Sequence, residues 1–488
     1  MLSRAATIFA TTVFHTWTAA PMASGGSCPW CPCQDPSLCR PLNPQPPKNR
    51  TEVIAYPRGI SGQYGQSRSD WRQYDWSKVT AVGLYDNLGN HECGCHTLEH
   101  PGNTPCNEWQ AQAFPDFCCL DAELICAAHA NNARVLIWDG GIGGCNGGNP
   151  SNASFPCANM VNSPIPEFLS QIRATPTVPP SHVTIDAWAA KSASYVQQLG
   201  MDGVVLDIEG IINITQSSRD ALSYGICALR QALEQSIPGS MLTLTMAATP
   251  FASGVHGVSL PEYGMFDIQA IDRCIDFFQP GAYCTCVGGP PPVFSRNGSA
   301  LNTSSWGIPP GTLDRGNMPM AVLQNIVSSY GALGIAPHRL VALMPWYGCD
   351  FLCADVLCAT VSTGPSLPEP VGGAPCGFPY GPFIPEGVDL KSLPPAPTGG
   401  PGYAQVLRMK EKIVGEVFHN VDAQTKSFRW RPGTVGTPMH QVTYDDPETY
   451  ATKYKWALEN QFRGIGFWMA DATDGNQEAI RDMWAAVP

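Results

Sequence analysis

Residues 201–209 read Met-Asp-Gly-Val-Val-Leu-Asp-Ile-Glu, and the fold assignment starts from this stretch. Between its acids the stretch is apolar, and short continuous apolar runs are typical of strands buried on both faces of a parallel sheet. Side chains two residues apart in a strand point to the same face, with Cα atoms about 6.6 Å apart. Asp207 and Glu209 are therefore predicted to lie side by side at the carboxyl end of a buried strand.

Seven further apolar runs alternate with helical patterns along the chain. Together with the run at 204–208 they lie at 53–56, 81–85, 135–138, 242–247, 277–283, 340–345 and 465–469. A helical stripe is formed by Leu222, Ile226, Leu229 and Leu233. Asp446-Pro447 has the N-cap acid and first-turn proline of a helix start. This alternation predicts an α/β fold, a (β/α)8 TIM barrel, with a doubly wound sheet as the alternative.

The composition excludes several classes of protein. The 488 residues are 44% hydrophobic and 14% charged, which excludes intrinsic disorder. A net charge of −12 without a basic cluster argues against nucleic acid as a partner. No run of about 18 apolar residues follows the N-terminus, so we expect no membrane span. We expect a monomer.

Cysteines and the N-terminus indicate the cellular compartment. Twenty cysteines are present, and adjacent pairs such as Cys118–Cys119 favour disulfides over thiolate zinc sites. Arg4, an apolar run at 5–20 and small residues after it resemble a signal peptide, with a disordered tail as the alternative. Sequons occur at Asn49, Asn152, Asn213, Asn297 and Asn302. These features predict the secretory pathway, leading to a lysosome-like compartment or to secretion.

The expected domain organisation follows from the same features. Residues 1–23 are the approximate signal peptide, 24–50 a Cys/Pro-rich segment, and 51–488 the barrel. Two Cys-, Pro- and Gly-rich segments, 87–120 and 349–440, interrupt the alternation and are predicted as insertions on the loop side of the barrel. The histidines near Cys93 and Cys95, which are His91, His96 and His100, lack a standard zinc spacing. No metal and no organic cofactor is predicted.

Two carboxylates at the carboxyl end of a barrel strand are a candidate catalytic pair, because barrel enzymes place their catalytic groups there. Ionising both is costly, so one of them usually stays protonated. A neutral acid beside an anion is what cleavage of a glycosidic bond requires. The alternative is that the acids end the strand in solvent, or pair with a neighbouring Arg or Lys.

The pattern Asp202-Gly-x-x-x-Asp207-x-Glu209 resembles the signature of glycoside hydrolase family 18, and within it the chitobiase type. Six more blocks carry the resemblance: Cys31-Pro-Cys-Gln-Asp-Pro-Ser-Leu-Cys39, Tyr74-Asp-Trp-Ser77, Met344-Pro-Trp-Tyr-Gly348, Gly373-Ala-Pro-Cys376, Tyr444-Asp-Asp-Pro447 and Arg463-Gly-Ile-Gly-Phe-Trp468. The blocks occur in order and span most of the chain, whereas 87–120 and 140–180 do not match well.

The resemblance implies hydrolysis of β-1,4-linked N-acetylglucosamine, in the chitobiose core of N-glycans or in chitin oligosaccharides, by a retaining mechanism without an enzyme nucleophile. Glu209 would protonate the leaving oxygen and later activate water. Asp207 would orient the N-acetyl group, whose oxygen attacks the anomeric carbon. Tyr283 would hydrogen-bond that acetamide.

The resemblance also implies sugar-binding aromatic residues. Trp468 would form the apolar floor under the reacting sugar, and Trp346 and Tyr347 would line the cleft. A structural role stays open for each of these three, since tryptophan in particular is often largely buried.

Two positions depart from the family pattern. Val205 stands where many members carry Asp, and Gly281-Ala-Tyr283-Cys284 replaces Met-x-Tyr-Asp. The alternative function is therefore a catalytically weak or inactive lectin that binds chitin oligosaccharides. Family lectins usually lose the glutamate, so the presence of Glu209 favours an active enzyme.

Overall fold

The computed structural model describes residues 33–57, 71–85, 123–139, 180–208, 215–247, 266–281, 318–352, 401–431, 433 and 440–488. The predicted signal peptide, the 87–120 insertion and the three histidines near Cys93 lie outside the described residues. The same is true of every sequon except Asn49, whose side chain is exposed.

Eight parallel strands close into a barrel in the order β1-β12-β7-β6-β5-β4-β3-β2. They are β1 (Glu52–Tyr56), β2 (Ala81–Tyr85), β3 (Arg134–Asp139), β4 (Gly203–Asp207), β5 (Met241–Ala247), β6 (Phe277–Gly281), β7 (Val341–Pro345) and β12 (Gly464–Trp468). Each of the eight predicted apolar runs forms one of these strands. The TIM barrel is therefore confirmed, and the doubly wound alternative is excluded.

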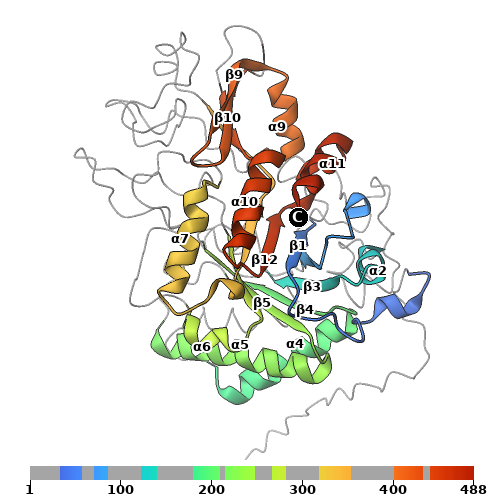
Figure 1. Ribbon diagram of the computed structural model, residues 1–488. Coiled ribbons are helices and arrows are strands. Elements are labelled where there is room, and N and C mark those ends of the chain that lie inside the picture. The colour runs from blue at the N-terminus through green and yellow to red at the C-terminus, as the bar shows by residue number, and fades with distance from the viewer. Residues whose placement is uncertain are drawn as a thin grey trace, which may run out of the picture.

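Helices cover the outside of the barrel. The helices are α2 (Glu123–Ala130), α4 (His182–Gln198), α5 (Gln216–Ser236), α6 (Ile268–Asp272), α7 (Met320–Gly331), α10 (Pro447–Glu459) and α11 (Gln477–Ala486). Short 3-10 turns are η1 (Pro36–Cys39), η2 (Trp71–Gln73), η5 (Pro337–Arg339) and η7 (Ala470–Thr473). Helices α4, α5 and α6 run together along one side (Figure 1). Among the described helices, none has the length and hydropathy needed to cross a bilayer.

Both helix signals in the sequence are confirmed. The predicted stripe lies on the buried face of α5, with all four of its side chains at most 1% exposed. Helix α10 begins at Pro447, and the Asp446 carboxylate accepts the backbone N–H of Thr449. The Thr449 hydroxyl in turn accepts the backbone N–H of Asp446, which completes a capping box.

A second sheet has three of its four strands within the predicted 349–440 insertion, and its fourth strand begins at the last residue of the insertion. Its strands are β8 (Cys349–Leu352), β9 (Ile413–Asn420), β10 (Thr425–Trp430) and β11 (His440–Tyr444), in the antiparallel order β8-β11-β10-β9, and α9 (Tyr403–Lys410) precedes β9. Strands β9 and β10 and helix α9 lie on the opposite side of the barrel from α4, α5 and α6 (Figure 1). The insertion thus contains regular structure that its Pro/Gly-rich composition did not predict.

The N-terminal segment is anchored to the barrel through the first acid of the 202–209 motif. The fully buried Asp202 carboxylate accepts the backbone N–H groups of Leu42 and Val135, each at 2.7 Å. It also accepts the side-chain amide of Gln45 at 2.6 Å, and its second oxygen lies 2.9 Å from Nε2 of His129. Asp202 therefore joins two barrel elements to the segment before β1, which is a structural role.

Two disulfides are formed among the described cysteines, Cys33–Cys126 and Cys227–Cys274. The first ties the N-terminal segment to α2, and the second ties α5 to the turn before β6. The Cys39 sulfur lies 3.1 Å from that of Cys33. Because Cys33 and Cys126 are already bonded to each other, this sulfur cluster is a disulfide site rather than a thiolate metal site. The disulfide prediction is confirmed for these two pairs.

Replacing the Asp202 carboxylate by an amide tests its anchoring role. We expect Asp202→Asn to lower the free energy of unfolding by about 2–4 kcal/mol, because buried hydrogen bonds to a charged acceptor contribute about 1.5–3 kcal/mol each. Urea denaturation of the purified protein measures this loss. Asp220→Asn on the exposed face of α5 is the matched control and should cost under about 0.5 kcal/mol. Equal midpoints for the two variants would contradict the role.

Candidate active site

Asp207 ends β4 on the face that looks into the barrel. Val205, two residues earlier, packs in the barrel interior with Ile54 and Leu136, and strand alternation puts Asp207 on the same face. Val205 is fully buried, whereas Asp207 is half-buried. The carboxylate thus lies where the packed interior gives way to the carboxyl-end opening. Glu209 lies outside the described residues.

A chain of neutral polar side chains fills the interior near Asp207. The Tyr56 hydroxyl donates to Oε1 of Gln279 at 2.6 Å, and the Gln279 amide donates to Oγ1 of Thr243 at 2.8 Å. All three side chains are buried. Thr243 is paired in register with Val205, one pleat below Asp207. The interior layer beneath Asp207 is therefore hydrogen-bonded but uncharged among the described residues.

The charge of Asp207 acts on this layer. Burial raises the pKa of the Tyr56 phenol far above its ordinary value, the hydrogen bond with Gln279 works against that rise, and the negative charge of Asp207 adds to it. Tyr56 therefore keeps its proton over the whole range in which proteins function. It is a neutral neighbour of Asp207 that cannot exchange a proton with it.

Thr245 lies beside Asp207 on the neighbouring strand. The two residues are paired in the register of β4 and β5, and alternation from the interior residue Met241 places Thr245 on the inward face. Its hydroxyl is buried and has no hydrogen-bond partner in the described part of the chain. A buried hydroxyl in this position is an available donor for a carboxylate or a bound ligand.

Trp468 ends β12 and reaches the same interior. Its half-buried ring packs with the interior cluster and meets the Tyr56 ring edge-on, at 6.1 Å between centroids and 63° between planes. Of the residues predicted for the site, Trp468 contacts the Tyr56 ring, and the charge of Asp207 acts on the Tyr56 phenol from the end of β4.

Trp346 and Tyr347 are placed in the core. The Trp346 ring stacks on Phe467 at 4.2 Å between centroids, and its indole N–H donates to the Tyr454 hydroxyl at 2.8 Å. Phe467 belongs to the cluster that packs outside the barrel wall. Trp346 is 1% exposed and Tyr347 2% exposed. This burial favours the structural role that the sequence left open for both residues.

The remaining predicted residues, Tyr283 and Cys284, lie outside the described residues, just after β6. The sequence did not predict that Tyr56, Gln279 and Thr243 form a hydrogen-bonded chain in the barrel interior. A signal for one of them existed, because Gln279 is a polar residue with a long side chain inside the apolar run at 277–283. Its partner Tyr56 is 223 residues away in sequence, and nothing local predicts that contact.

Comparison with known proteins identifies similar sequences over nearly the whole chain. A family model described as glycosyl hydrolases family 18 matches residues 183–473. The chain is 22% identical over 466 residues to the di-N-acetylchitobiase of Rattus norvegicus, covering 94% of this chain and 92% of the rat protein. It is also 22% identical over 460 residues to that of Homo sapiens, covering 93% and 87%.

Solved structures share the fold. A Group IV chitinase of Ostrinia furnacalis in complex with allosamidin superposes with a TM-score of 0.52 at 15% identity, covering 90% of this chain and 97% of that one. A family 18 chitinase of Cycas revoluta in complex with (GlcNAc)3 gives 0.51 at 14% identity, covering 89% and 99%. At these identities the likeness concerns the fold alone.

The hydrogen bond between Tyr56 and Gln279 is testable by a double-mutant cycle. Tyr56→Phe should lower the free energy of unfolding by about 1–3 kcal/mol, because it leaves a buried amide oxygen without a donor. Gln279→Leu should then cost less in the Tyr56→Phe background than in the wild type, with a coupling of about 0.5 kcal/mol or more. Tyr224→Phe, which removes a hydroxyl bonded to Asp186 near the surface, is the control. Strictly additive losses in urea denaturation would show that Tyr56 and Gln279 are not coupled.

Proposed function

The chain belongs to glycosyl hydrolases family 18 and is a glycoside hydrolase; we propose that it cleaves the β-1,4 bond between N-acetylglucosamine residues of short oligosaccharides, with retention of anomeric configuration. The observation that carries the proposal is the position of Asp207, half-buried on the inward face at the carboxyl end of β4, where its charge acts on Tyr56, whose ring contacts that of Trp468. Relatives named di-N-acetylchitobiase, aligned over nearly the whole chain, support a short substrate related to N,N′-diacetylchitobiose.

In the first step Glu209 donates its proton to the glycosidic oxygen. As the bond between that oxygen and the anomeric carbon breaks, the carbonyl oxygen of the substrate's own N-acetyl group bonds to the anomeric carbon and forms an oxazolinium ion. The leaving sugar departs as an alcohol. In the second step the Glu209 carboxylate takes a proton from water, whose oxygen adds to the anomeric carbon and restores the acetamide.

Asp207 has a different task, since it stays anionic. Its carboxylate accepts the N–H of the acetamide, which turns the carbonyl oxygen towards the anomeric carbon. The same negative charge stabilises the positive charge that develops on the oxazolinium ion. Tyr283 donates to the acetamide oxygen, and the Trp468 ring forms an apolar floor beneath the sugar.

The layer of side chains beneath Asp207 contains no acid among the described residues. Val205 and the buried Tyr56, Gln279 and Thr243 provide no acid with which Asp207 could share a proton. We infer that Asp207 and Glu209, two residues apart on the same face, titrate as a coupled pair. The charge of Asp207 then favours the protonated form of Glu209, which the first step requires.

We further propose that the protein enters the secretory pathway and works in a lysosome-like compartment or outside the cell. The Cys33–Cys126 and Cys227–Cys274 disulfides support this, because disulfides persist in oxidising compartments. The exposed Asn49 offers one accessible sequon.

The proposed acid is tested by removing its proton. Glu209→Gln should lower kcat/KM for chitotriose by about 100- to 10,000-fold, because an amide cannot donate the proton, while calorimetric binding of the same trisaccharide is retained. Glu459→Gln, an exposed residue at the end of α10, is the matched control and should keep full activity. Wild-type turnover by Glu209→Gln would show that Glu209 is not the acid. A wild-type protein that binds chitotriose without cleaving it would instead support the lectin alternative.

A further inference from the structure

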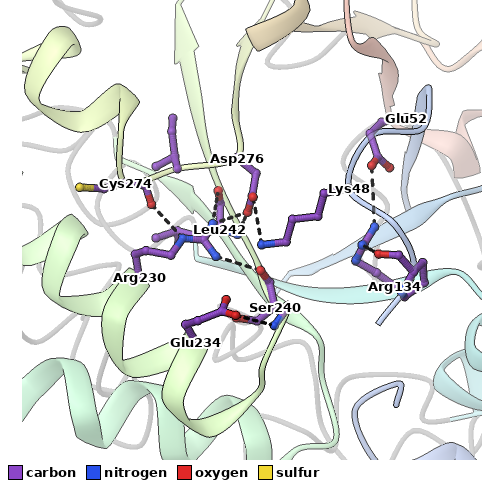
Figure 2. Close-up of polar contacts among 12 residues, drawn as sticks. Lys48, Glu52, Arg134, Arg230, Glu234, Ser240, Leu242, Cys274 and Asp276 are labelled. Carbon is purple, nitrogen blue, oxygen red and sulfur yellow. Dashed lines mark hydrogen bonds and ion pairs between the residues drawn. The ribbon is translucent and has the colours of Figure 1, made fainter. Parts of the chain in front are cut away.

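Arginines gather at the amino ends of the barrel strands, and two of them have every guanidinium nitrogen matched with an acceptor. Arg230 donates to two backbone carbonyl groups and pairs with Asp276, as Figure 2 shows. Arg339 donates to the Asp272 carboxylate and to three backbone carbonyl groups. These two side chains have the saturated hydrogen bonding expected of buried guanidinium groups.

Two other arginines at the same end are not saturated. Nε and Nη1 of Arg134 are buried, and so are Nε and Nη2 of Arg463, yet none of the four has an acceptor in the described part of the chain. Nε of Arg50 is in the same state. The Arg134 side chain is completely buried, and only its Nη2 is bonded, to the backbone oxygen of Pro46. Buried N–H donors therefore outnumber their acceptors here.

Among the described residues, the carboxylate within 4 Å of Arg134 and Arg50 is that of Glu52. Its Oε1 is 3.7 Å from Nη1 of Arg134, and its Oε2 is 3.9 Å from Nε of Arg50 (Figure 2 shows the contact with Arg134). Both distances are too long for a hydrogen bond. The negative charge of Glu52 also reaches Arg463. Asp276 also acts on Arg134 and Arg463, but it is paired with Lys48 and Arg230. Glu52 thus faces three guanidinium groups and cannot neutralise all of their positive charge.

The fold encloses this cluster. Glu52 and Arg134 begin β1 and β3 on the inward face, two residues before the interior side chains Ile54 and Leu136. The Arg463 guanidinium lies over the interior ring of Phe277, at 5.0 Å from its centroid. The donors therefore converge on the amino end of the barrel interior, at the opposite end of β4 from Asp207.

Few ligands can both accept hydrogen bonds from these buried guanidinium groups and balance their positive charge. Burial lowers the pKa of Arg134 and Arg463, which reflects the cost of holding their charges away from water. A water molecule accepts hydrogen bonds but brings no charge, and its own hydrogens need acceptors. A small anion accepts from several N–H groups at once and neutralises part of the excess charge.

We propose that the Arg134, Arg463 and Arg50 cluster binds a small monovalent anion of the chloride class at the amino end of the barrel. The anion contacts the unmatched guanidinium N–H groups and supplies the negative charge that Glu52 alone does not.

Thermal unfolding in sodium chloride and in sodium gluconate of equal ionic strength tests the site. Because an anion that binds only the folded state stabilises it by mass action, Tm should rise by about 2–5 °C and saturate in chloride but not in gluconate. Arg463→Met should abolish the difference between the two salts. Glu52→Gln should shift the saturation midpoint to lower chloride, because it removes the carboxylate nearest to the guanidinium groups, which repels an anion.

Arg339→Met is the matched control, since it removes a saturated arginine from the same end of the barrel. It should lower Tm and keep the full chloride dependence. Identical Tm values in the two salts, or the same chloride dependence for Arg463→Met and the wild type, would overturn the proposal. A crystal of the wild-type protein grown in bromide provides a test that needs no variant. An anomalous peak between Arg134 and Arg463 is expected, and a water molecule or an empty space there would contradict the site.

Discussion

Closure of eight parallel strands forces every second side chain into one narrow interior, and the rest of the molecule depends on how that interior is filled. Its middle is apolar, with Ile54, Leu136 and Val205 in contact. The amino end carries Glu52 and Arg134, and the carboxyl end opens at Asp207. The charged groups at the two ends of the barrel are thus separated by apolar and neutral polar side chains.

This separation explains the chemistry expected at the carboxyl end. Val205 lies beneath Asp207, and the hydrogen-bonded side chains of Tyr56, Gln279 and Thr243 near it are neutral. In the proposed mechanism the negative charge of Asp207 acts on the substrate. Many family members carry Asp where this chain has Val205, so the proposed reaction would proceed here without that additional carboxylate.

The eight barrel strands were predictable because burial on both faces leaves a continuous apolar run in the sequence. The second sheet was not, because β9 is a mostly exposed edge strand that includes Gly415 and Glu416 and lies in a Pro/Gly-rich segment. Asp207 and Trp468 could be assigned from local motifs. The hydrogen bond between Tyr56 and Gln279 forms only when the barrel closes, so no local sequence pattern predicts it. The burial of Trp346, which favours a packing role over a sugar contact, is likewise visible only in the structure.

The proposed mechanism requires that the substrate's own acetamide, oriented by Asp207, displaces the leaving sugar. Time-resolved proton NMR of chitotriose cleavage by the purified protein measures this most directly, through the configuration of the newly formed reducing end. Two successive displacements at the anomeric carbon predict that the β anomer appears first and mutarotates afterwards. Initial release of the α anomer would contradict the account.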